Sequence, residues 1–111
     1  MELREEEVGG VTALAVKGRI DNTTARVLGQ RLETVVATPR SRVVVDLREL
    51  EYISSAGFRV LLVAAKRADE AGSRLALCGL SANIRQLFDL GGFLDAFTIT
   101  ATRDDAIAAA K

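Results

Sequence analysis

The 111-residue chain contains no histidine and no tryptophan, and it has only one cysteine and one proline. Histidine carries acid–base chemistry near neutral pH more often than any other side chain, and it is the commonest transition-metal ligand. Its absence argues against most classes of enzyme and metalloprotein. Cys78 stands alone, which excludes an internal disulfide and a thiolate metal cluster. We therefore expect no catalytic residue, no metal site and no cofactor.

Neither sign of charge is in excess, because Lys and Arg together number 15 and Asp and Glu together also number 15. A chain without a basic field has no general attraction to nucleic acid or to anionic lipid. The acidic run at residues 5–7 stands where a signal peptide would have a basic end and an apolar stretch. No run approaches the roughly 18 consecutive apolar residues that suggest a membrane span. These features predict a soluble cytoplasmic protein with no nucleic-acid or membrane partner.

Size and composition indicate an ordinary globular chain. Apolar residues make up 49% of the sequence and charged residues 27%, which is close to average usage. Domains commonly hold about 100–200 residues. We therefore expect a single domain over residues 1–111 with one hydrophobic core.

Strand-like and helix-like segments alternate along the chain. Apolar positions recur every three or four residues in the helical segments, and short apolar or β-branched runs mark the strands. The expected strands are Leu3–Val8, Val11–Val16, Val43–Leu47, Leu75–Cys78 and Phe97–Thr100, and the expected helices are Thr23–Ala37, Gly57–Ala71, one after Ser81, and Thr102–Ala110. This order predicts an α/β fold, and the hairpin signal Gly9-Gly10 makes the sheet mixed.

Two loops hold the candidate functional residues, because ligands of open α/β sheets sit beyond the carboxyl ends of the strands. One loop is Gly18–Thr24 and the other is Tyr52–Gly57. Ser55 lies just before the second expected helix, at an expected N-cap, where its hydroxyl would accept a hydrogen bond from the first turn. The same position suits a phosphorylation site, since a helix N-terminus offers free N–H groups to a phosphate. Ser54 competes with Ser55 for this role.

Other candidates flank these serines. Asp21 is interpreted either as a turn residue that satisfies its own loop backbone or as an acid that faces the second serine across the end of the sheet. Thr23 or Thr24 is expected to cap the first helix. On the second helix, an exposed Phe58 and an exposed Arg59 would contribute to a binding surface.

Three segments together resemble the STAS-domain family, whose best-known members are bacterial anti-sigma-factor antagonists. The first, Asp46-Leu-Arg-Glu-Leu-Glu-Tyr-Ile-Ser-Ser-Ala-Gly-Phe-Arg-Val-Leu62, is similar to the family pattern of Asp-Leu, an apolar pair, Asp-Ser-Ser/Thr-Gly-Leu and a continuing helix. Gly18–Ala25 looks like the family's Gly-x-Leu-Asp-x-x-Thr-Ala segment, and Leu80–Gly92 looks like its Ser-Pro-x-Val-x-x-Leu-Phe-x-x-x-Gly segment. Element order and length match over essentially the whole chain.

The resemblance implies a sheet of four or five strands with helices mostly on one face, in a regulatory protein that is not an enzyme. In the family, an unphosphorylated antagonist binds an anti-sigma factor that is itself a serine kinase, and this frees the sigma factor. The kinase then phosphorylates a loop serine, which breaks the complex, and a serine phosphatase restores it. Alignment through Gly57 makes Ser55 the phospho-acceptor, and Asp21 matches the acid in the neighbouring loop. The implied partner-binding surface consists of Asp21, Thr24, Ser54, Ala56, Gly57, Phe58, Arg59 and Leu62.

Two departures from the family pattern bear on this switch. Ser54 stands in place of the Asp, and Ala56 replaces the second hydroxyl residue. Loss of the Asp removes one negative charge beside the acceptor and bears on kinase recognition. A second interpretation is therefore a stand-alone STAS scaffold or ligand-sensing module in which Ser55 is only a cap. A small hydrolase and a purely structural subunit are the remaining interpretations, and the expected assembly is a monomer or a weak homodimer.

Overall fold

The structure, a computed structural model of residues 1–111, contains one five-stranded sheet, four α-helices and one short 3₁₀ helix. In chain order the elements are β1 (Glu2–Val8), β2 (Val11–Ile20), α1 (Asn22–Ala37), β3 (Arg42–Ile53), α2 (Ser55–Glu70), β4 (Arg74–Cys78), α3 (Ala82–Leu90), η1 (Leu94–Ala96), β5 (Thr98–Thr100) and α4 (Arg103–Ala110). None of these helices is both long enough and apolar enough to cross a membrane.

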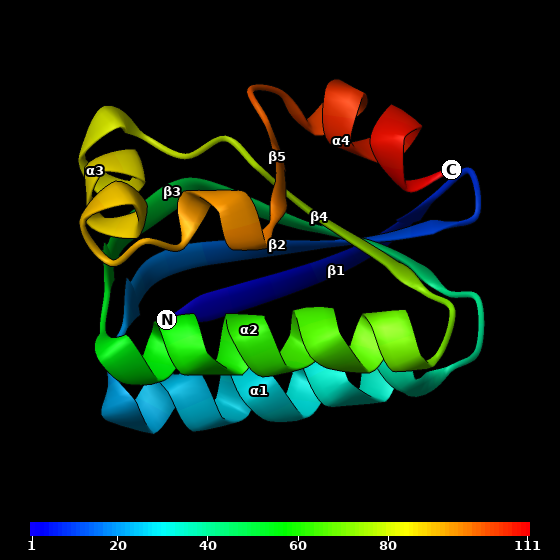
Figure 1. Ribbon diagram of the computed structural model, residues 1–111, viewed down its shortest axis with the longest axis horizontal. Helices are drawn as coiled ribbons and strands as arrows, with labels where there is room; N and C mark the ends of the chain where they lie inside the picture. The colour runs from blue at the N-terminus through cyan, green and yellow to red at the C-terminus, as the bar shows by residue number, and fades with distance from the viewer.

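The strands lie in the spatial order β1-β2-β3-β4-β5 (Figure 1). β1 is antiparallel to β2, and every other neighbouring pair is parallel. The β1–β2 hairpin closes at Gly9 and Gly10, whose φ angles of 57° and 81° suit a two-residue turn that side chains with a Cβ rarely adopt. Each parallel connection carries at least one helix, as parallel crossovers require. The predicted α/β fold with a mixed sheet is therefore confirmed.

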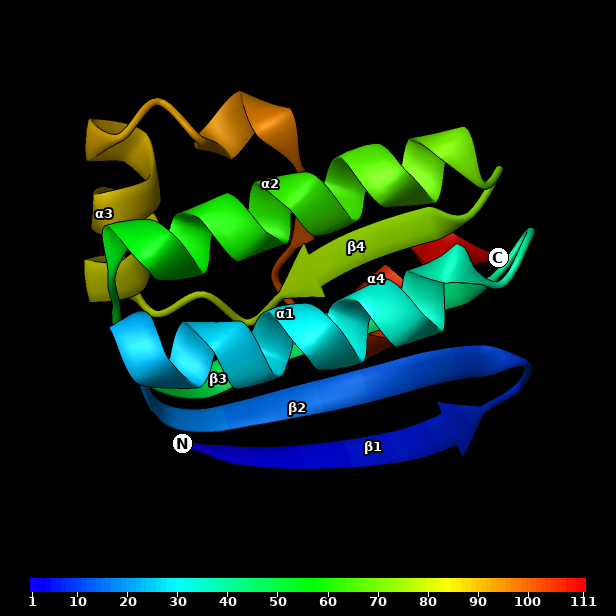
Figure 2. The same ribbon diagram turned by 90° about the horizontal axis from the view of Figure 1, so that it is seen from below.

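Helices cover the two faces of the sheet unequally (Figures 1 and 2). α1 and α2 lie side by side on one face, and side chains of α3 join the same core. This main core includes Leu14, Leu28, Leu61, Leu77 and Phe88, all fully buried. On the opposite face α4 covers a smaller core made of Val11, Val44, Ala76, Cys78, Ala106 and Ala110. The arrangement agrees with the expected sheet of four or five strands with helices mostly on one face.

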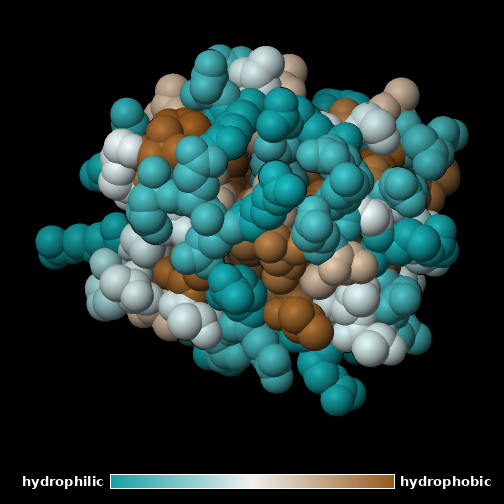
Figure 3. All heavy atoms as spheres, turned by 180° about the vertical axis from the view of Figure 1, so that it is seen from behind, coloured by the Kyte–Doolittle hydropathy of each residue, from teal (hydrophilic) through white to brown (hydrophobic).

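β1 forms a polar edge, as its sequence predicts. Five of its seven residues are exposed, and only Leu3 and Val8 are partly buried. The side of the molecule that carries this edge is mostly hydrophilic, with apolar atoms in separate patches (Figure 3). Charged side chains along an edge strand oppose pairing with the edge of another sheet.

β2 and β3 are longer than the sequence pattern predicts, because β2 continues to Ile20 and β3 continues to Ile53. The register between the two strands shifts twice near the end of β2. Such irregularities interrupt the two-residue alternation by which strands are recognised in a sequence. Both shifts place the extra residue in β3, so the buried Leu50 falls out of phase with Val45 and Leu47, and the second shift brings Ile53 back into phase.

The longer strands shorten the two predicted loops to one residue each. Asp21 alone links β2 to α1, and Ser54 alone links β3 to α2. The prediction of longer loops over residues 18–24 and 52–57 is therefore wrong. Both helices also begin earlier than predicted, at Asn22 and Ser55.

A buried serine fastens the end of α1 and the start of β3 to the start of β4. Ser73 is 7% exposed, and its hydroxyl donates to the carbonyl oxygens of Val36 and Thr38, which lie 3.1 and 3.0 Å away and share its proton. The same oxygen accepts a hydrogen bond from the backbone N–H of Ser41 at 3.0 Å. Removal of the hydroxyl would leave buried backbone groups without partners.

We expect Ser73→Ala to lower the free energy of unfolding by about 1–3 kcal/mol, because buried polar groups lose their hydrogen bonds. Urea denaturation followed by circular dichroism measures the change. Thr34→Ala, which removes an exposed hydroxyl from α1, is the matched control and should change stability by less than about 0.5 kcal/mol. Equal losses in the two variants would contradict the fastening role of Ser73.

Cys78 lies in the small core beneath α4 and is fully buried. Burial, together with the nearby carboxylate of Asp46, raises the pKa of its thiol to about 11. The reactive species is the thiolate. At neutral pH the thiol of Cys78 is therefore both shielded and protonated.

We expect Cys78 in the native protein to be unreactive toward a thiol-specific disulfide reagent at neutral pH, and to react fully once guanidinium unfolds the chain. The absorbance of the released thiolate measures the extent of reaction. Rapid reaction of the native protein would contradict this expectation, because it would mean that α4 leaves the sheet readily and exposes the thiol.

Candidate functional site

Asp21 and Ser54 lie at the same end of the sheet because β2 and β3 are parallel neighbours. The backbone N–H of Ser54 donates to the carbonyl oxygen of Ile20, with 2.8 Å between nitrogen and oxygen. This hydrogen bond joins the two single-residue links, so α1 and α2 begin side by side (Figure 2). We call this region, defined by Asp21, Ser54 and Ser55, the helix-start end.

Asp21 caps α1. One oxygen of its carboxylate accepts hydrogen bonds from the backbone N–H groups of Thr23 (3.0 Å) and Thr24 (2.9 Å), and the Thr24 hydroxyl accepts one from the backbone N–H of Asp21 (2.8 Å). This reciprocal arrangement is a capping box. The hydrogen bonds from Thr24 lower the pKa of Asp21 below its usual value, and the bond from Thr23 adds to the effect.

The capping box decides between the interpretations of these residues. Asp21 satisfies its own loop, as the first interpretation predicted, and its carboxylate is engaged within its own turn. The prediction that Thr23 or Thr24 caps α1 is wrong. The cause is the length of β2, which leaves Asp21 as the only residue between strand and helix.

The two serines at the start of α2 are in different situations. Ser54 is the N-cap, and its hydroxyl accepts a hydrogen bond from the backbone N–H of Gly57 at 3.2 Å. Ser55 is the first residue of the helix and is exposed, and its hydroxyl has no hydrogen-bond partner in the chain. The prediction that Ser55 is the cap is therefore wrong by one position. Because Ile53 still belongs to β3, the helix begins directly after Ser54.

Gly57 allows α2 to begin against the ends of both strands. A Cβ at this position would lie 2.6 Å from Cγ1 of Ile53 and 2.7 Å from Cγ2 of Ile20. Carbon atoms pack favourably at about 3.5–4.0 Å, so any side chain here would push the helix away from the sheet. Gly57 is itself buried and acts through the position it gives to its neighbours.

Phe58 belongs to the core. Its side chain is 8% exposed, stacks on Phe93 with 4.7 Å between ring centroids, and meets Phe88 edge-on at 4.8 Å. The expectation of an exposed Phe58 is therefore wrong. The reason is the phase of the helix, since Phe58 lies three residues before the buried Leu61 and on the same face.

The other predicted residues gather where a partner can reach them. Asp21 and Arg59 are exposed, and Thr24, Ser54 and Ala56 are half-buried around the helix-start end. Leu62 is also half-buried but lies nearly two turns further along α2.

A groove between α1 and α2 begins about one turn from this end, at Arg26 and Arg59, and sequence reasoning missed it. Its volume is about 300 Å³, and its lining includes Arg26, Gly29, Gln30 and Glu33 of α1 and Arg59, Val60, Val63, Ala64 and Arg67 of α2. The four-residue spacing of Ser55, Arg59, Val63 and Arg67 is a signal for one wall, because it places these residues in one row on a helix. No comparable signal in the sequence identifies the face of α1 that forms the other wall.

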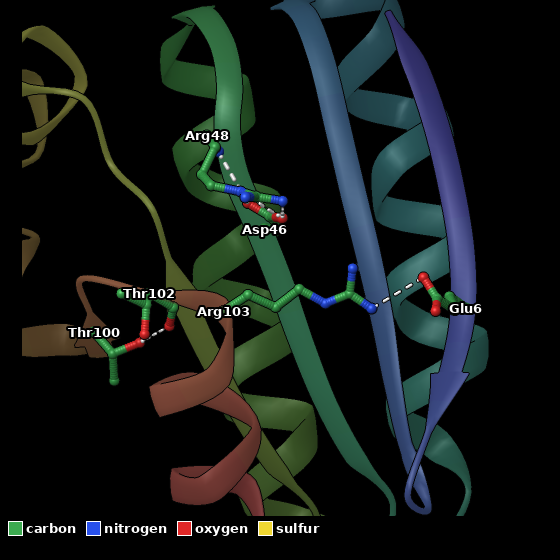
Figure 4. A network of polar contacts seen from close by, with 6 residues as sticks. All are labelled: Glu6, Asp46, Arg48, Thr100, Thr102 and Arg103. Atoms are coloured by element: carbon green, nitrogen blue, oxygen red, sulfur yellow. Dashed lines mark hydrogen bonds and ion pairs between the residues drawn. The ribbon is translucent and has the colours of Figure 1, made fainter.

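The opposite face of the sheet carries a charged groove of about 260 Å³ beside α4. Four of the five ion pairs in the structure line it, namely Arg4–Glu2, Lys17–Glu49, Arg48–Asp46 and Arg103–Glu6. In Figure 4, Arg103 reaches from α4 across β2 to Glu6 on β1, with 3.0 Å between nitrogen and oxygen. Every charge in these pairs therefore has a partner, and the Arg103–Glu6 pair links α4 to β1. No group of three or more Cys, Asp or Glu side chains is arranged to bind a metal ion.

The sequence of this chain matches a known protein family and several of its members. Residues 2–106 match the STAS domain. BtrV of Bordetella bronchiseptica, which is named as an anti-sigma factor antagonist, is 36% identical over 111 residues, or 100% of this chain and 96% of BtrV. The anti-sigma-B factor antagonist of Listeria monocytogenes is 30% identical over 99 residues, or 89% of this chain and 86% of that protein.

A solved structure agrees with these relatives. The crystal structure of an anti-sigma factor antagonist from Mycobacterium paratuberculosis superposes with a TM-score of 0.85 at 27% identity, and the match covers 98% of this chain and 92% of that chain. The family match covers residues 2–106, the relatives extend over almost the whole chain, and the fold is shared. This chain therefore belongs to the STAS domain family.

Proposed function

We propose that this protein is a cytoplasmic, non-enzymatic anti-sigma factor antagonist that binds an anti-sigma serine kinase through its helix-start end and is released when that kinase phosphorylates Ser55. The observation that carries the proposal is the free hydroxyl of Ser55. It is exposed at the first position of α2, while the neighbouring Ser54 performs the capping. Modification of Ser55 would therefore break no hydrogen bond of the folded protein.

The position also suits a phosphate electrostatically. A phosphoserine carries about −1.5 to −2 charges at neutral pH. The first turn of a helix has N–H groups without helical partners and the positive end of the helix dipole. The phosphorylated chain would thus remain folded, while a dianion would enter a contact that had accepted a neutral hydroxyl. Repulsion and desolvation at that contact would dissociate the complex, and a serine phosphatase would restore binding.

The departure at Ser54 is compatible with this switch. The family pattern has Asp at this position, and both Asp and Ser are strong N-cap residues. Ser54 makes the capping hydrogen bond to Gly57, so the start of α2 keeps its place without the carboxylate. The change removes one negative charge beside Ser55, and a kinase for this protein would have to recognise the neutral cap.

Substitution of each serine separates capping from modification. We expect Ser54→Ala to lower the free energy of unfolding by about 0.5–2 kcal/mol, because α2 loses its cap. Ser55→Ala removes an unbonded, exposed hydroxyl and should change stability by less than about 0.5 kcal/mol. Chemical denaturation of both variants and the wild type measures the difference. A larger loss for Ser55→Ala than for Ser54→Ala would contradict the assigned roles.

Phosphorylation can be tested directly. We expect the purified protein, incubated with ATP and a panel of anti-sigma serine kinases from its source genome, to gain one phosphate from its cognate kinase. Intact mass measures the number of phosphates, and peptide mapping places the phosphate on Ser55. The kinase should bind the unphosphorylated protein at least about tenfold more tightly than the phosphorylated form, a difference of about 1.4 kcal/mol.

Two variants control this experiment. Ser55→Ala should bind the kinase but accept no phosphate, and Ser54→Ala should still be phosphorylated. Phosphate on Ser54 would contradict the assignment of the acceptor. Binding of a kinase without any phosphate transfer would favour the alternative, a STAS scaffold or ligand-sensing module that has no phospho-switch.

A further inference from the structure

The groove between α1 and α2 exists because the two helices approach closely at a glycine. A Cβ at Gly29 would lie 3.1 Å from Cγ1 of Val60, which is tighter than ordinary contact, so a side chain there would require Val60 to shift. Beyond this contact the floor of the groove is apolar, with Val63 and Ala64 on α2. Val63 is 48% exposed, which makes it one of the few large apolar side chains that the fold leaves open to solvent.

Positive charge is concentrated in this groove. Arg26 and Arg59 line its part nearest the helix-start end, and Arg67 lines its far part. None of the three takes part in any ion pair of the structure, although the chain as a whole carries no net charge. The N-terminus of α2, which has the neutral cap Ser54, adds the positive end of its helix dipole to the same end, whereas the carboxylate of Asp21 already caps α1. The one acidic residue of the lining, Glu33, lies two turns further along α1.

The groove begins one helical turn from the proposed phosphorylation site. Ser55, Arg59 and Val63 follow one another at intervals of four residues on α2, and all three are exposed. Residues four apart on a helix have Cβ atoms about 5–6 Å apart. A partner that covers Ser55 would therefore also meet Arg59 and, one turn further, Val63.

We propose that this groove is the docking surface for a partner segment that presents an acidic side chain to Arg26 and Arg59 and an apolar side chain to Val63. The inference rests on the proposed function, because the partner that docks in the groove is the anti-sigma kinase that phosphorylates Ser55. Charge complementarity defines the segment: two arginines without partners attract a carboxylate, and the apolar floor between the helices takes the neighbouring apolar side chain.

The same arrangement gives phosphorylation a second way to weaken binding. A phosphate on Ser55 lies one helical turn from Arg59, within the reach of its guanidinium, and Arg–phosphate pairs are strong. The phosphate would then occupy the arginine that the carboxylate of the partner needs. Repulsion between the phosphate and the partner, and engagement of Arg59 by the phosphate, would both weaken binding.

The test uses matched pairs of variants on the full chain. Affinity for the cognate kinase from the panel, measured by isothermal titration calorimetry, should fall by about tenfold or more in Arg59→Glu and in Val63→Asp. Arg85→Glu places the same charge reversal at an exposed site on α3, and Val27→Asp places the same polar change at an exposed valine of α1 outside the groove lining. Both controls should bind within about twofold of the wild type. All four positions are solvent-accessible, and equal thermal melting curves would show that each variant is folded.

The outcomes separate the groove from the switch. If the wild type binds and accepts phosphate while both groove variants bind as tightly as the controls, the docking surface is overturned and the proposed function stands. If no kinase binds the wild type, the proposed function fails and the docking surface fails with it. In Arg59→Gln, phosphorylation of Ser55 should weaken binding by a smaller factor than in the wild type. An equal factor would overturn the capture of Arg59 by the phosphate.

Discussion

The contact of Gly57 with Ile53 and Ile20 is the constraint on which the rest of the site depends. Two neighbouring parallel strands end at the same level, and the first turn of α2 rests directly on their last side chains. The hydrogen bond from Ser54 to the carbonyl oxygen of Ile20 fixes the same junction through the backbone. Because only one residue links each strand to its helix, the positions of the junction residues are tightly constrained. Small shifts here would move the whole of α2 and the groove beside it.

This tight junction explains why two adjacent serines differ in role. A single-residue link leaves Ser54 in extended backbone, with its hydroxyl turned back to the N–H of Gly57. Ser55 is already helical, and its side chain leaves the helix on the solvent side. The cap and the proposed modification thus fall on different hydroxyl groups. The hydroxyl of Ser54 is engaged with a backbone N–H, whereas that of Ser55 is free.

The sequence predicts the helices well because their apolar residues keep a constant period. Leu28 and Leu32 on α1 are both buried as that period requires. It predicts the ends of β2 and β3 poorly, because extra residues break the alternation of β3 and because Lys17, Gly18 and Arg19 interrupt the apolar run of β2. The error of one residue at Ser55 is a direct consequence, since an N-cap can be placed only when the end of the preceding strand is known.

Phe58 and the α1–α2 groove fail to appear in the sequence for a different reason. Phe58 is covered by Phe93, which is 35 residues away in the chain, and only the three-dimensional arrangement brings α3 and η1 over this part of α2. Likewise, nothing in the sequence around Gly29 of α1 indicates its contact with Val60. The residue pattern indicated the order of the elements and the candidates Ser55 and Asp21, and the family resemblance favoured Ser55 over Ser54 as the phospho-acceptor. Neither contained information about which helix faces meet.

The distribution of ion pairs gives the strongest contrast between the two faces of the molecule. On the sheet face beside α4, cations and anions alternate along the groove and neutralise one another in four pairs. The arginines between α1 and α2 have no such partners, and the positive end of the α2 dipole lies beside them. Exposed ion pairs contribute little to folding stability, so a fold does not require all its charges to be paired. The fold does, however, place unpaired arginines near one another. Their mutual repulsion is unfavourable, and an acidic partner would relieve it on binding. Although the net charge is zero, the molecule therefore has one groove whose charges are paired and one groove with unpaired arginines, and the second begins one helical turn from Ser55.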